Sequence, residues 1–92
     1  MKVVFEKPYI FEKKEYTEIE LTEMENLTAE DVFAAEAYAR KKTGGGFGVA
    51  ENSASYLLHL AAAAAKLPIE FMESLPIKDA ARVKYAAMGF FQ

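Results

Sequence analysis

The sequence predicts an α+β fold in which an N-terminal β-hairpin packs on a bundle of three to four α-helices. Residues 3–21 are rich in β-branched and aromatic side chains, which favour strands. Residues 28–42 open with a helix-capping pattern, and residues 51–91 are rich in alanine and leucine, which favour helices. At 92 residues, the chain is expected to form a single domain over residues 1–92.

The hairpin is expected within residues 1–22. Pro8 cannot donate a hydrogen bond to a neighbouring strand, so the first strand lies at an edge or is interrupted there. The polar residues 12–15 fit a four-residue loop. In the second strand, residues 16–21, alternation places Tyr16 with two glutamates on one face, which is expected to be solvated. Because an isolated hairpin is only marginally stable, helices must cover the other face.

The helix over residues 28–42 is expected to begin with Thr28 as its cap and to end on basic residues that suit the negative end of the helix dipole. Its predicted apolar face is formed by Val32, Phe33, Ala35 and Ala39.

Residues 43–50 are glycine-rich and predict a loop. The next helix ends at Lys66 and is apolar nearly all round, which predicts burial or contact with a partner. Two leucine–proline pairs then introduce a short helix at 69–74 and a last helix at 77–88, because proline suits the first helical turn.

Composition and charge exclude several classes of function. The absence of cysteine excludes a disulfide framework, a thiol nucleophile and a cysteine-based metal site. Residues 1–31 carry nine acids and four bases, net −5, whereas residues 32–92 carry five acids and seven bases, net +2. The overall net charge of −3 argues weakly against a non-specific DNA binder, which needs a basic surface. Without a secretory signal or an apolar run of bilayer length, the protein is expected in the cytoplasm.

Three patterns that can carry chemistry favour simpler interpretations here. The glycine segment lacks the Gly-Lys-Ser/Thr ending of a phosphate-binding loop. His59, the only histidine, lies in the apolar helix and is interpreted as structural. Glu18 and Glu20 share a strand face and could bridge a divalent ion, but carboxylates on a strand are far more often part of a solvated face. We therefore expect no catalytic residues, no cofactor and no metal.

The remaining signal is apolar surface. The Ala/Leu helix, the glycine segment, the aromatic hairpin and the aromatic C-terminus together exceed what a small core hides easily. A self-contained core remains an alternative for the helix itself. The candidate protein-binding residues are Leu57, Leu60, Ala61, Phe90 and Phe91.

The order of elements resembles the small tail assembly chaperones of long-tailed bacteriophages and prophages, over residues 1–92. The resemblance lies in the arrangement rather than in a single motif. The stretches that carry it are residues 16–21, 27–32, 57–61, 67–68, 75–79, Val83 and 90–91.

This resemblance implies a non-enzymatic protein that binds the tail tape measure protein and promotes assembly of the tail tube protein. It also implies a role in the host cytoplasm, absence from the mature virion and, in some members, self-association into homo-oligomers. Many weak, sequence-tolerant apolar contacts suit such a role. Independently of the resemblance, the short apolar runs predict no membrane partner, and the net negative charge argues against a nucleic-acid partner.

Two alternatives of other classes remain open. One is a structural component of the virion, either a tail protein or a head–tail completion protein. The other is a small helical regulatory or nucleic-acid-binding domain. Its basic face would consist of Lys41, Lys42, Lys66, Arg82 and Lys84.

Overall fold

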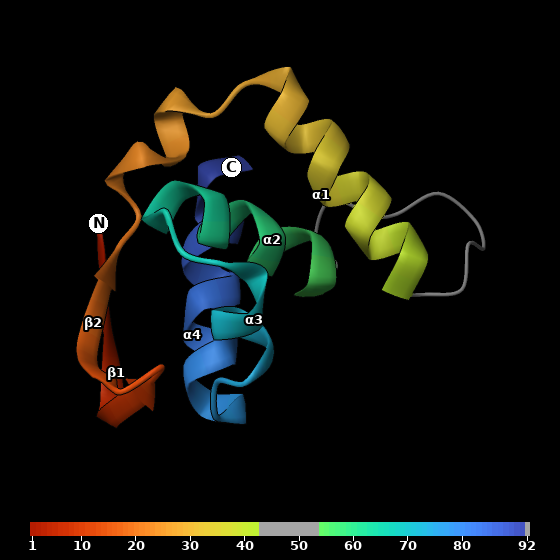
Figure 1. The fold of residues 1–92 in the computed structure, drawn as a ribbon. Helices are drawn as coiled ribbons and strands as arrows, with labels where there is room; N and C mark the ends of the chain where they lie inside the picture. Colours follow the sequence, from red (N-terminus) through yellow and green to blue (C-terminus); the bar gives the residue numbers. More distant parts are fainter. Residues whose placement is uncertain (43–53, 92) are drawn as a thin grey trace.

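The computed structural model describes residues 1–42 and 54–91, and it confirms the predicted α+β fold with a hairpin followed by helices (Figure 1). The expected loop at 43–50 lies outside the described residues. The elements in order are β1 (Lys2–Phe11), β2 (Lys14–Glu20), the short 3₁₀ helix η1 (Thr22–Asn26), α1 (Ala29–Lys42), α2 (Ala54–Ala65), α3 (Ile69–Glu73), α4 (Ile77–Met88) and the 3₁₀ turn η2 (Gly89–Phe91).

Helix α2 lies at the centre of the molecule, between α1 and α4, and also packs on η1, α3 and β2 (Figure 1). Leu57 and Leu60 of this helix are buried in the core, with 0% and 1% of their surface exposed. The same core cluster includes small side chains of the neighbouring helices, among them Ala35 and Ala39 of α1 and Ala87 of α4. Burial on several sides accounts for the nearly uniform apolar character of this helix.

The two strands pair antiparallel, with an interruption in β1 at the predicted proline. Val4 pairs with Glu18 and Tyr9 pairs with Tyr16, so four residues of β1, including Pro8, lie opposite one residue of β2. Such a bulge breaks the strict alternation of faces. The prediction that Tyr16 lies on the solvated face is therefore wrong, because its ring turns toward the core.

The hairpin turn is shorter than predicted. The strands leave only Glu12 and Lys13 between them, rather than the four polar residues 12–15. Both residues adopt left-handed backbone conformations, with φ of 49° and 67°. Two consecutive left-handed residues are the geometry that matches the twist of a two-residue hairpin, even though neither residue here is glycine.

Phe71 of α3 connects the hairpin to the helices. Its side chain is fully buried, and four aromatic rings of the hairpin surround it at centroid distances of 4.8–6.2 Å. These rings belong to Phe5, Tyr9, Phe11 and Tyr16. Edge-on ring contacts of this kind add to the gain from burial itself.

Helix α1 begins where the sequence predicts. The backbone N–H and the hydroxyl of Thr28 both donate to Asp31 Oδ2, at 2.9 and 3.2 Å, so the aspartate closes the first turn from within the helix. Ala35 and Ala39 are buried as expected. Phe33, however, is 63% exposed, because its helical position points well away from the face that carries the two alanines.

Candidate protein-binding surfaces

The structure separates the predicted binding residues. Leu57, Leu60 and Ala61 are at most 1% exposed and belong to the core around α2. A partner could contact most of their surface only if the helices separated. Phe90, in η2, is 38% exposed. The side chain of Phe91 lies outside the described residues.

A cavity of about 320 Å³ brings Leu60 and Phe90 together where η1, α1 and α2 meet the C-terminal end; we call it the C-terminal cavity. Its lining residues are Met24, Glu25, Leu27, Val32, Leu60 and Phe90. Apolar walls with a partly exposed aromatic residue suit an apolar side chain from a partner. The sequence gives no signal for Met24 and Glu25 at this cavity, because their segment has the composition of a connector.

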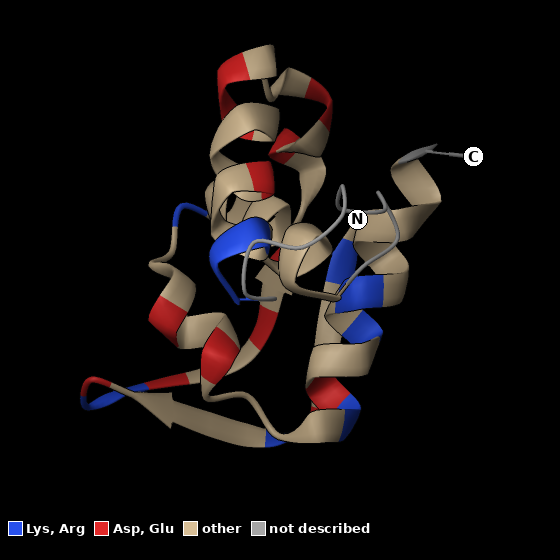
Figure 2. Cartoon of the chain, turned by 90° about the vertical axis from the view of Figure 1, so that its right-hand side faces the viewer, with Lys and Arg blue, Asp and Glu red and all other residues tan. Residues whose placement is uncertain are grey.

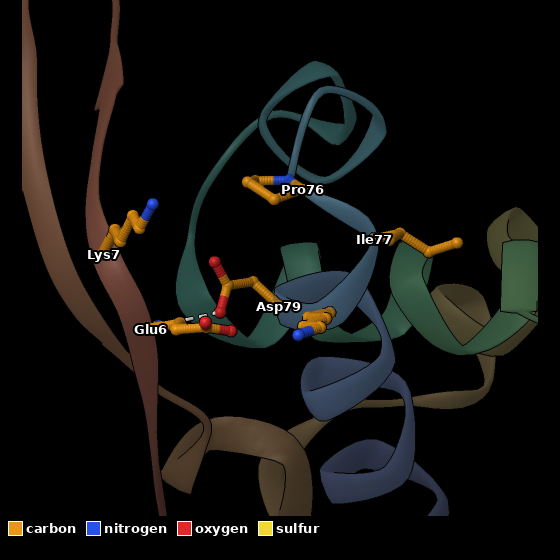
Figure 3. A pocket seen from close by; sticks show the side chains of 6 residues that line it. Glu6, Lys7, Pro76, Ile77 and Asp79 are labelled. Carbon is orange, nitrogen blue, oxygen red and sulfur yellow. Dashed lines mark hydrogen bonds between the residues drawn. The ribbon is translucent and has the colours of Figure 1, made fainter.

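A second cavity, of about 270 Å³, lies where the start of α4 faces β1, and Figure 3 shows its lining. We call it the β1–α4 cavity. It is lined by Glu6, Lys7, Pro76, Ile77, Lys78 and Asp79. Asp79 is only 2% exposed, and its Oδ1 accepts hydrogen bonds from the backbone N–H of Glu6 and from Arg82 Nη1, both at 2.9 Å. This carboxylate therefore holds the start of α4 against the interrupted part of β1.

A model of the family described as "Phage tail assembly chaperone proteins, E, or 41 or 14" matches residues 2–92. The chain belongs to the phage tail assembly chaperones. The family resemblance inferred from the order of elements is thereby confirmed. No curated protein and no solved structure matches the chain significantly. Within the described residues of this chaperone, no helix combines the length and apolarity needed to cross a membrane.

A polar cluster of the chaperone joins the end of α1 to α3. The hydroxyl of Tyr38 donates to Glu73 Oε2 at 2.6 Å, and Lys42 Nζ lies 3.0 Å from the same oxygen. These two contacts, the tyrosine first, lower the pKa of Glu73. Burial, followed by the bond to Glu73, raises the pKa of Tyr38. Because the charges of this cluster are paired with one another, it serves as a link between helices.

His59 lies half-buried on α2, with its ring centroid 5.0 Å from that of Tyr38. Its Nδ1 is buried and has no hydrogen-bond partner among the described residues. Burial lowers the pKa of His59, and the charge of Asp31 opposes that effect only in part. The packing of α1 on α2 in the chaperone therefore favours the neutral imidazole.

We expect the free energy of unfolding of the chaperone to decrease as the pH is lowered, because of His59. Below its ordinary pKa of 6.5, the unfolded chain binds this proton more readily than the folded chain. The contribution of His59 is thus fully present above pH 6.5 and declines as the pH falls toward the lower folded-state pKa. His59→Phe should lose less stability than the wild type between pH 6.5 and about 5, as measured by urea unfolding at each pH.

The comparison uses the slope of the unfolding free energy against pH. A change in packing caused by the phenylalanine is the same at every pH and therefore does not alter this slope. Glu20 and Glu73 also have lowered pKa values, but their ordinary value of 4.5 places their effect at more acidic pH. Parallel pH profiles for the variant and the wild type would contradict the assignment.

Proposed function

We propose that this chaperone binds the tail tape measure protein and promotes assembly of the tail tube protein, without enzymatic activity. The family match supports a role in tail assembly, and the C-terminal cavity is the observation that points to client binding. In that cavity, Phe90 offers apolar surface at the edge of a hollow whose walls are mainly apolar. An extended apolar client requires contacts that tolerate many sequences, and shallow apolar hollows provide them.

The proposed setting is the cytoplasm of the bacterial host, with the protein absent from the mature virion. Homo-oligomer formation stays a prediction. Several copies along one client would raise the overall affinity through avidity. Of the basic residues considered for nucleic-acid binding, Lys42 and Arg82 are paired with carboxylates in the structure. These two cations are therefore already engaged and contribute less to a nucleic-acid-binding face.

Co-expression with the tape measure protein tests the proposal. We expect the soluble fraction of the tape measure protein to rise when this chain is present and the two to co-purify. Equal insolubility with and without the chain would refute the proposed function. Detection of the chain in purified virions would instead favour a structural component.

Phe90→Ser should weaken client binding without unfolding the chaperone. Because Phe90 is 38% exposed, its truncation removes contact surface at the cavity and disturbs little of the core. We expect a loss of roughly tenfold in affinity for the tape measure protein, typical of an aromatic residue at an interface. Phe33→Ser is the matched control, since Phe33 is an exposed phenylalanine outside the C-terminal cavity. Equal losses in both variants, or none in Phe90→Ser, would remove the cavity from the proposal.

A further inference from the structure

Helix α4 has a second apolar face that points away from the core. Val83 and Ala87 are fully buried and four residues apart, which defines the inward face. Ile77, Ala81 and Tyr85 repeat with the same spacing on the opposite side of the helix. Ile77 is 86% exposed and Tyr85 is 64% exposed. We call Ile77, Ala81 and Tyr85 the α4 stripe.

Cations border the α4 stripe on both sides. At 100° per residue, Lys84 falls on one flank, and Lys78 and Arg82 fall on the other. The one carboxylate of α4, Asp79, is buried against β1. Figure 2 shows basic segments along the helix that leads to the C-terminus and an acidic segment near its start.

Two of these cations are available to a partner. Among the described residues, Lys78 forms no ion pair and Lys84 rests 5.4 Å above the ring of Tyr85. Arg82 is already held by Asp79 at 2.9 Å and by Glu6 at 3.8 Å. New carboxylates beside the α4 stripe would therefore meet lysines that have no carboxylate partner within residues 1–42 and 54–91.

We infer that the α4 stripe binds an amphipathic helix of a tail protein, one whose apolar side is bordered by acidic residues. The stripe extends over two helical turns, roughly 12 Å, which matches the spacing of anchors in helix-on-helix recognition. Ala81, the small residue at its centre, allows a partner helix to approach between Ile77 and Tyr85. Complementary charge fixes the orientation and speeds the encounter.

This inference rests on the proposed function for the identity of the partner, but it concerns a separate surface. The α4 stripe shares no residue with the C-terminal cavity. One chaperone could therefore hold a helix on α4 while an apolar side chain occupies the cavity.

The test uses two synthetic helical peptides of about 18 residues, or five turns. Both carry the same leucine stripe, bordered by glutamate in one peptide and by lysine in the other. Fluorescence anisotropy with the full chain should give at least ~10-fold tighter binding of the glutamate peptide, and added salt should weaken it. Equal binding of the two peptides would overturn the inference.

The variant is Ile77→Ser with Tyr85→Ser, which should weaken binding of the glutamate peptide ~10-fold or more. The matched control is Val4→Ser with Ile10→Ser, because both residues are 60% exposed on the hairpin. Circular dichroism verifies that both variants remain folded. Undiminished peptide binding by the α4 variant overturns the inference. The inference is also overturned if the α4 variant loses only self-association, or if it loses only binding to a labelled DNA duplex.

Co-expression separates this inference from the proposed function. If the wild type and the α4 variant solubilise the tape measure protein equally and bind the glutamate peptide equally, the α4 inference fails and the proposed function stands. If the wild type binds the peptide selectively but leaves the tape measure protein insoluble, the proposed function fails and the α4 surface stands.

Discussion

Phe71→Ala is expected to lower the free energy of unfolding by about 4 kcal/mol, within the range for truncation of a buried phenylalanine. The side chain is fully buried and contacts rings from both strands of the hairpin. Its removal leaves a cavity that rigid aromatic neighbours cannot close. Since a domain of this size has a total stability of roughly 5–14 kcal/mol, the variant should be close to unfolding at moderate temperature.

Urea unfolding measures this loss, with Phe71→Leu expected to fall between the wild type and the alanine variant. Phe33→Ala is the control, because Phe33 is 63% exposed and its truncation should change stability by less than ~0.5 kcal/mol. Amide hydrogen exchange adds a local test. Amides of β1 and β2 should lose more protection than those of α1, because the ring cluster connects the hairpin to α3. A loss under ~1 kcal/mol would contradict the assigned role.

Asp79→Ala is expected to cost about 2–3 kcal/mol, even though the residue is a single carboxylate on a small domain. Its removal leaves the Glu6 backbone N–H without its acceptor in a partly buried position. Arg82 also loses its 2.9 Å partner, but this side chain is 46% exposed and can turn toward water. Most of the cost should therefore come from the unsatisfied N–H and from loosening of β1 against α4.

Asp79→Asn separates the two contacts. The amide oxygen can still accept from the Glu6 N–H, while the charge that attracts Arg82 is lost, so about half of the destabilisation is expected. Lys78→Ala is the control, since Lys78 is an exposed neighbour on the same turn. All three are compared by thermal unfolding. If Asp79→Ala unfolds at the same temperature as the wild type, the carboxylate does not hold α4 in place.

Most of the fold could be predicted because its elements carry local signals. The leucine–proline pairs placed both C-terminal helices within a residue of their observed ends, since proline acts within the turn it occupies. The prediction that Tyr16 lies on the solvated face is wrong, because the face of this residue depends on the bulge in the opposite strand, β1. Pro8 indicates that pairing is interrupted but not how many residues the interruption takes. The apolar face predicted for α1 is too wide, because this helix buries little more than its small residues. Helical spacing places Phe33 well away from Ala35 and Ala39, which agrees with its exposure.

The candidate surfaces were harder to predict than the fold. An apolar helix can be buried or exposed, and Leu57 belongs to the core. The sequence does not predict the burial of Asp79, because an acid in the first turn of a helix is common at the surface and only the approach of β1 buries this one. The α4 stripe does have a sequence signal in the spacing of Ile77, Ala81 and Tyr85. That signal becomes meaningful only once Val83 and Ala87 are known to face inward.

The alanines at the centre of the molecule also bear on how relatives of this protein can be recognised. Ala61, Ala62 and Ala64 are at most 3% exposed, and Ala35 and Ala39 approach from α1. A larger side chain at any of these buried positions would have to displace packed neighbours, which typically costs about 1–3 kcal/mol. The exposed positions of α4 and η2 are under no such limit and are free to vary in size. Divergent relatives should therefore be traced by the small-residue pattern of α2 more reliably than by overall identity.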